Sequence, residues 1–150
     1  MTDAGDKSRL PVLVYPVVSG LILAAAFPPL PLGFLAYVGL IPLLLSAERL
    51  QGRSAFGAGF LNGVVFYGAT VYWIAWITPP GTAGAIFYLS LIQGLLVWML
   101  SIAMRRLGTF GLWSAPFLWV GFEYFITLGD MGFPWMALAY SQTRYLALIQ

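Results

Sequence analysis

The residues that decide the fold read SAFGAGFLNGVVFYGATVYWIAWI (54–77), then the turn TPPG (78–81), then AGAIFYLSLIQGLLVWMLSIAM (83–104). No charged residue occurs between Arg53 and Arg105. A helix of about 20 apolar residues is long enough to cross the hydrocarbon core of a bilayer, and the two prolines of the turn end the first run. The stretch therefore predicts two consecutive transmembrane helices.

The rest of the chain has the same character, with 61% hydrophobic and 8% charged residues and a mean hydropathy of +0.88. An average soluble domain carries about 25% charged residues. We therefore predict an all-α fold, a polytopic transmembrane helix bundle of about five spans in one domain over residues 1–150. An aromatic outer loop and the start of a further segment follow the fifth span. The expected spans cover residues 10–26, 33–47, 54–77, 83–104 and 112–128, and the outer loop covers about 129–145.

The first apolar run, Leu10–Ala26, has an alternative interpretation as a cleaved signal peptide. Lys7 and Arg9 resemble the basic start of such a peptide, and the three alanines at 24–26 fit a cleavage site. A retained first span is the leading interpretation, because the run is long enough to cross a bilayer before the prolines that follow it.

The basic residues predict the orientation of the bundle, because Lys and Arg in short loops favour the cytoplasmic side. If the N-terminus is cytoplasmic, Arg144 alone falls outside. The residues that fall inside are Lys7, Arg9, Arg49, Arg53, Arg105 and Arg106. The alternation therefore predicts a multi-pass protein with a cytoplasmic N-terminus and with the Gly132–Trp135 loop on the outer side.

Small residues recur every four positions on the third expected span, at Ala55, Gly59 and Gly63. Such a stripe lets two backbones approach closely where lipid gives no hydrophobic drive for helices to associate. We expect it to pack against another helix of the same chain, with dimerisation as the alternative.

Several kinds of chemistry are excluded by composition. The chain contains no Cys and no His, so it has no thiolate nucleophile, disulfide or histidine ligand to offer. The glycines near Gly59 lack the spacing of a nucleotide fingerprint, and the seven basic residues are too dispersed for a nucleic-acid patch. We expect no catalytic residue, cofactor or metal in this chain, and no nucleic-acid partner.

Glu123 is the one carboxylate within an expected span, and an ionisable group in a bilayer is a functional-site hypothesis by default. Trp119 precedes it by four residues and so shares its helix face. The alternative is a structural carboxyl that is hydrogen-bonded to Asn62, Gln93 or a tyrosine. The glycine, proline and two aromatic residues of Gly132–Trp135 predict a fixed turn that lines or docks something at the outer face.

Three motifs follow one another near the end of the chain: PFLWVGFE (116–123), GFPW (132–135) and AYSQ (139–142). Together with AFPP (26–29) and GATVYWI (68–74), they resemble the signature of apolipoprotein N-acyltransferase. One departure is Ile126, which stands where the family commonly has an arginine three residues after the glutamate.

The resemblance implies an enzyme of the bacterial inner membrane that transfers an acyl chain from a phospholipid to the N-terminal diacylglyceryl cysteine of lipoproteins. It implies that this chain is the N-terminal membrane scaffold, inactive alone, because the family's catalytic Glu-Lys-Cys set cannot be placed in it. The implied partners are the phospholipid donor, the lipoprotein and membrane lipids. The residues expected to line the substrate path or to dock the catalytic domain are Trp119, Glu123, Phe133, Pro134, Trp135, Tyr140 and Gln142.

The residues alone leave another class open, a small standalone membrane protein such as a transporter or channel subunit, or a membrane assembly partner. Transporter spans tend to carry paired intramembrane charges or matching interrupted helices. Here Glu123 is the only such charge, which makes this class the second choice.

Overall fold

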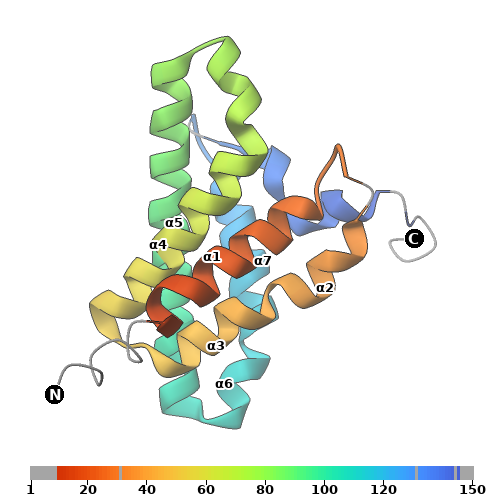
Figure 1. Cartoon of the computed structure of the whole chain (residues 1–150). Coiled ribbons are helices and arrows are strands. Elements are labelled where there is room, and N and C mark those ends of the chain that lie inside the picture. Colours follow the sequence, from red (N-terminus) through yellow and green to blue (C-terminus); the bar gives the residue numbers. More distant parts are fainter. Residues whose placement is uncertain (1–9, 31, 131, 144, 146–150) are drawn as a thin grey trace, which may run out of the picture.

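The computed structural model describes residues 10–30, 32–130, 132–143 and 145, and within this part every regular element is helical (Figure 1). This confirms the all-α prediction. In chain order the elements are α1 (Leu10–Ala25), η1 (Gly33–Leu35), α2 (Ala36–Gly39), α3 (Ile41–Arg49), α4 (Gly52–Val71), η2 (Tyr72–Trp76), α5 (Pro79–Leu107), α6 (Thr109–Trp113), α7 (Ala115–Ile126), η3 (Pro134–Met136) and η4 (Leu138–Gln142), where η marks a 3₁₀-helix.

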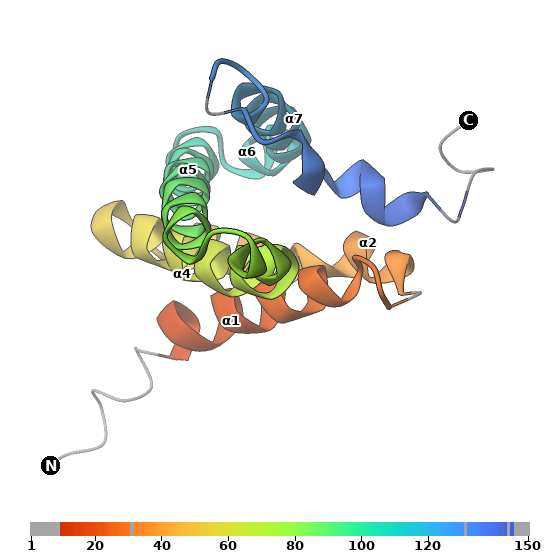
Figure 2. The ribbon, with the colours of Figure 1, turned by 90° about the horizontal axis from the view of Figure 1, so that it is seen from above.

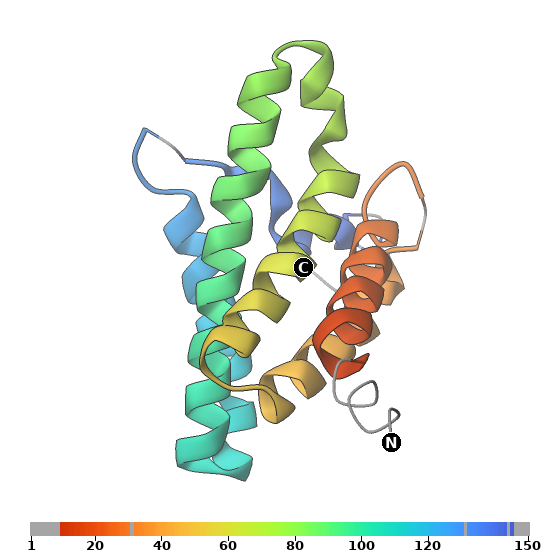
Figure 3. The same ribbon diagram turned by 60° about the vertical axis from the view of Figure 1, so that its left-hand side comes forward.

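The hairpin of α4 and α5 is the tallest feature of the molecule (Figures 1 and 3). Residues Gly52–Trp76 and Pro79–Leu107, 25 and 29 residues long, are both long and apolar enough to cross a membrane. Helix α5 begins four residues before the expected start at 83, because Pro79 suits a first helical turn and Thr78 caps it. The Thr78 hydroxyl accepts a hydrogen bond from the Gly81 amide at 3.3 Å.

The stripe of small residues brings α4 against α5. A Cβ atom on Gly59 would lie 2.6 Å from the carbonyl oxygen of Gln93, and one on Gly63 would lie 2.7 Å from the Cα of Ser90. Side chains larger than hydrogen would therefore push the two helices apart. The structure confirms that the stripe packs within the chain.

Two expected spans are not single helices. The run 33–47 is divided into η1, α2 and α3, with a break at Leu40, because Pro42 lacks the N–H that would extend the helix. The run 112–128 is likewise divided: it begins inside α6, which starts at Thr109, and Pro116 lies in the first turn of α7 after a break at Ser114. Each of these two runs is therefore built from more than one helix.

Buried polar side chains tie the helices to one another. Asn62 of α4 donates to the Pro16 carbonyl of α1 at 2.9 Å and accepts from the Gln93 amide of α5 at 3.2 Å. The Ser19 hydroxyl donates to the Gly39 carbonyl at 2.6 Å, which joins α1 to α2. Each bond satisfies a polar group that would be costly to bury alone. Figure 2 shows the result, with α4 lying between α1 and α5.

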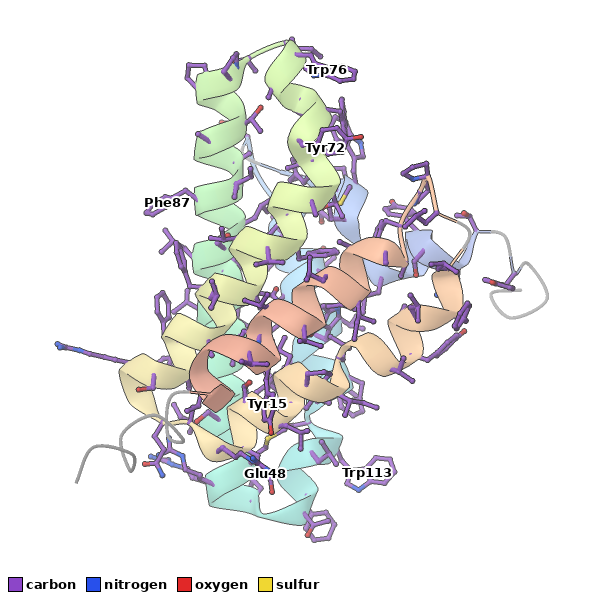
Figure 4. All side chains as sticks on the ribbon, viewed as in Figure 1. Tyr15, Glu48, Tyr72, Trp76, Phe87 and Trp113 are labelled. Carbon is purple, nitrogen blue, oxygen red and sulfur yellow. The ribbon has the colours of Figure 1, made fainter. Side chains whose placement is uncertain are left out.

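The outer surface is apolar. Trp76 and Phe117 are 84% and 80% exposed, and Figure 4 shows Trp76, Phe87 and Trp113 pointing away from the bundle. A helix in water would carry polar residues on this face. The surface is therefore of the kind that lipid covers.

The turns gather at two ends of the molecule. The turn between α4 and α5, the residues after α1 and the residues after α7 lie toward one end in Figure 1. The α3–α4 connection and the α5–α6 turn lie toward the opposite end. The segment that carries most of the candidate residues, from Gly132 to Gln142, therefore belongs to the end at which α4 meets α5.

Candidate functional site

The Glu123 carboxylate of α7 holds the segment that follows its own helix. Its Oε1 atom accepts two hydrogen bonds, from the Trp119 indole at 2.7 Å and from the Leu138 backbone amide at 2.8 Å. The Trp119 bond follows from the four-residue spacing on one helix. The Leu138 bond is a contact between α7 and η4, and it fixes the outer segment against the bundle.

The chain turns back between these two partners through a tight loop. Gly129 has a positive φ of 74°, a conformation that glycine adopts without strain. The Gly132 amide donates to the Gly129 carbonyl at 3.0 Å, and the Phe133 amide donates to the Ile126 carbonyl at 2.8 Å. Pro134 then starts η3. The fixed turn predicted from the GFPW sequence is confirmed.

Beneath this turn lies a cavity of about 30 Å³. Its lining includes Glu123 and Trp119 of α7, Phe133 and Pro134 of the outer segment, and Tyr67 of α4. A cavity of this volume holds about one water molecule.

Aromatic rings extend the contact of the outer segment toward the α4–α5 turn. Phe133 and Trp135 meet edge to face with ring centroids 5.3 Å apart, and Trp135 lies 6.0 Å from Trp73 of η2. Such ring pairs contribute about 0.5–1.5 kcal/mol beyond the burial of their area. Trp135 still keeps half of its surface exposed, so its outer edge is available to a further contact.

Tyr140 and Gln142 lie away from this cavity. Gln142 is buried, and its amide donates to the Gly33 carbonyl at 2.8 Å and to the Ser141 hydroxyl at 2.7 Å. Its Oε1 atom is buried with no hydrogen-bond partner among the described residues. Tyr140 is exposed, and its side chain makes no hydrogen bond to the described part of the chain. Gln142 therefore ties η4 to η1, while Tyr140 faces outward.

Among the residues that it describes, the structure does not pair Glu123 with Asn62, Gln93 or a tyrosine, the partners considered for a structural carboxyl. Gln93 donates to Asn62, Asn62 donates to α1, and within the described ranges no tyrosine donates to Glu123. Tyr67, which the sequence reading did not single out, lines the cavity instead. Tyr67 continues the four-residue spacing of Gly59 and Gly63. That spacing is the sequence signal that places Tyr67 on the same face of α4 as these glycines.

The contacts of Glu123 hold the outer segment in place, and the cavity beside them has few groups that could take part in covalent chemistry. Glu123 and Tyr67 are the titratable side chains lining the cavity in the described part of the chain. A carboxylate whose oxygen is already occupied by two donors is suited to positioning. The site therefore holds the outer segment against the bundle beside a small cavity.

Comparison with known proteins decides the family. The family model described as the apolipoprotein N-acyltransferase N-terminal domain matches residues 19–150. The chain belongs to this family. All of the candidate residues of the apolipoprotein N-acyltransferase signature, from Trp119 to Gln142, lie within the matched region.

Curated relatives named apolipoprotein N-acyltransferase agree with this assignment. The chain is 37% identical to that of Geobacter metallireducens over 145 residues, which cover 89% of this chain and 28% of the relative. It is 29% identical to that of Gloeobacter violaceus, with 89% and 29% covered, and 29% identical to that of Chlorobaculum tepidum, with 90% and 26% covered. The chain thus spans little more than a quarter of the length of these relatives.

Proposed function

We propose that this chain is the N-terminal membrane scaffold of a bacterial apolipoprotein N-acyltransferase. The whole enzyme would take an acyl chain from a phospholipid and transfer it to the amino group of the N-terminal diacylglyceryl cysteine of lipoproteins. The observation that carries the proposal is the family match over residues 19–150. It does not favour a standalone transporter or channel subunit.

The scaffold would cross the inner membrane five times, with its N-terminus in the cytoplasm and the Gly132–Trp135 loop in the periplasm. Two observations support this proposal. The turns alternate between the two ends of the molecule (Figure 3). Helix α1 is also built into the bundle through the buried residues Pro16, Ser19 and Leu23, as expected of a retained first span.

The outer segment would act as the part of the scaffold that meets substrate and the catalytic domain. Its inner side closes the cavity through Phe133 and Pro134, while Trp135 and Tyr140 keep exposed aromatic surface on its outer side. Exposed aromatic residues are typical anchors of protein contacts. Trp119 and Glu123 would set the position of this segment, and Gln142 would tie its end to η1.

A chimeric enzyme tests the proposal. The N-terminal region of the Geobacter metallireducens relative is replaced by this chain, and acyl transfer from a phospholipid to a diacylglyceryl lipopeptide is measured. We expect transfer by the chimera and none by this chain alone, because the chain has no cysteine to carry an acyl group.

A second chimera carries Trp135→Ala and Tyr140→Ala, which removes the two half-exposed rings of the outer segment and leaves the Glu123 bonds in place. We expect it to insert normally and to transfer acyl groups more slowly. If the first chimera is folded and membrane-inserted but does not transfer at all, this chain is not an interchangeable scaffold and the proposal is wrong. Turnover by the isolated chain would contradict its assignment as an inactive part.

A further inference from the structure

A second feature lies at the opposite end of the α4–α5 hairpin, where three arginines line two shallow hollows beside apolar residues. Two hollows of about 370 and 380 Å³ meet at Trp98 of α5. We call their combined surface the arginine groove, and its residues used here are Arg53, Leu95, Trp98, Ile102, Arg105 and Arg106. It shares no residue with the cavity at Glu123.

The spacing along α5 makes the groove continuous. Leu95, Trp98, Ile102 and Arg105 follow one another at intervals of three or four residues, so they lie on one face of the helix. Ten residues separate the first from the last, about 15 Å along the helix axis. The face is apolar at Leu95 and ends in charge at Arg105, and Arg53 of α4 lines the neighbouring hollow.

The positive charge of the groove is not neutralised by the described part of the protein. Arg53 and Arg106 make no ion pair with any described residue. Arg105 uses its Nε atom to donate to the Ser101 carbonyl at 3.1 Å, which leaves its terminal nitrogens without a described partner. The nearby Arg49 differs, because it donates to the Tyr15 hydroxyl at 3.3 Å and its guanidinium lies 5.5 Å from that ring.

We propose that the arginine groove binds an anionic phospholipid. The phosphate group would lie at the arginines that line these hollows, Arg53 in one and Arg105 and Arg106 in the other, because each arginine can donate several hydrogen bonds to it. An acyl chain would follow the apolar face past Trp98 and Leu95, with the indole ring packed against it. This occupant matches both the charge and the apolar surface of the groove.

A water-soluble anion or a nucleic acid would match only the arginines and leave the apolar surface uncovered. Trp98 and Leu95 lie on the exposed face of α5, a helix that is apolar and long enough to cross a membrane. Basic hollows between membrane helices are a known way to bind acidic headgroups. The inference depends on α5 lying in a membrane and is independent of the acyltransferase activity.

The test uses the whole chain reconstituted in phosphatidylcholine bilayers that contain a minor fraction of phosphatidylglycerol. Brominated acyl chains quench tryptophan fluorescence on contact, so bromine is placed either on phosphatidylglycerol or on phosphatidylcholine. Trp98 is one of six tryptophans, and its own signal is the difference between the parent chain and Trp98→Phe. We expect stronger quenching by brominated phosphatidylglycerol than its share of the bilayer predicts.

Two substitutions separate the groove from general surface charge. An arginine near an anionic membrane contributes roughly 1 kcal/mol, or about a fivefold change in binding. Arg53→Gln should therefore lower the preference of Trp98 for phosphatidylglycerol about fivefold. Arg49→Gln removes the same charge four residues away, outside the groove, and should leave the preference unchanged. If Arg53→Gln loses its helical circular dichroism, Arg106→Gln is used in its place. It should lower the preference for phosphatidylglycerol by the same factor.

Equal quenching by the two brominated lipids in the parent chain would overturn the proposal. An equal loss of preference in Arg49→Gln and Arg53→Gln would also overturn it, because the effect would then belong to the charge of the whole membrane surface. Neither result would affect the assignment of the chain to its family.

Discussion

Replacing Glu123 by alanine should release the outer segment from the bundle. The substitution removes the oxygen that accepts from the Trp119 indole at 2.7 Å and from the Leu138 amide at 2.8 Å. A donor left unsatisfied costs about 1–3 kcal/mol when it is buried. Both donors here are half-buried, so we take the low end of that range, about 1 kcal/mol for each bond and about 2 kcal/mol for the pair.

The natural assay is hydrogen exchange of the Leu138 amide, because it reports the opening of this segment alone. A loss of about 2 kcal/mol corresponds to a roughly 30-fold increase in the population of the open form. The Leu138 amide of Glu123→Ala should therefore exchange about 30-fold faster than in the parent chain. Amides in the middle of α5 should not change, because this helix makes no hydrogen bond to Glu123 in the described structure.

Glu123→Gln is the matched control. Its amide oxygen can accept the same two hydrogen bonds without the charge, so Leu138 exchange should rise by about tenfold or less. Trp119→Phe removes one donor and should reduce the additional effect of Glu123→Ala, as expected of residues in direct contact. If Glu123→Ala leaves Leu138 exchange unchanged, the carboxylate does not hold the segment. If Glu123→Gln is as damaging as Glu123→Ala, charge and not the acceptor geometry is responsible.

Three further substitutions test other contacts. Gly59→Ala should destabilise the bundle by about 1–3 kcal/mol through overpacking. The loss is measured as the decrease in helix content during titration with a denaturing detergent. Gly57→Ala on the same helix should not destabilise the bundle, because open space surrounds that position. Asn62→Leu should cost about 2 kcal/mol in the same titration, because it leaves the buried Gln93 amide without its acceptor. Gly33→Ala should detach η4 from η1, because its Cβ would collide with the backbone there, and cleavage after residue 142 by a protease should become faster.

Sequence patterns predicted the long elements well, because the signals are local. The uncharged run between Arg53 and Arg105 is sufficient to predict the α4–α5 hairpin, and the spacing of Gly59 and Gly63 predicts its close packing. The Trp119 bond to Glu123 is equally local, since both residues lie on one face of one helix. In each case the decisive residues are separated by few positions along the chain.

The divided helices could have been anticipated. Pro42 and Pro116 each lie within an apolar run, and each marks the first turn of a new helix after a break. A reading based on hydropathy alone merges such pieces, because the apolar character continues across the break. Attention to the missing N–H groups would have divided them correctly.

The contacts of the outer segment could not be predicted in the same way. The second donor to Glu123 is the backbone amide of Leu138, and a backbone amide carries no sequence signal. Its position depends on the whole turn that begins at Gly129. Gln142 meets the carbonyl of Gly33 across 109 positions of the chain, a pairing that only the packing of α1 on the bundle creates. Tertiary packing therefore determines the candidate site.

Labelling of single cysteines with a membrane-impermeant maleimide shows on which side of the membrane each turn of the chain lies. The chain has no cysteine of its own, so each introduced thiol is the only target. The positions chosen are exposed and lie outside the long helices: Leu30, Gln51, Ile77, Thr109 and Asp130.

In intact cells with a permeable outer membrane, the variants Leu30→Cys, Ile77→Cys and Asp130→Cys should react from the periplasm. Gln51→Cys and Thr109→Cys should react only after the inner membrane is opened. That pattern requires the chain to cross the membrane between each successive pair of sites. Labelling of Gln51→Cys in intact cells, or protection of Asp130→Cys, would contradict the orientation and with it the periplasmic position of the Gly132–Trp135 loop.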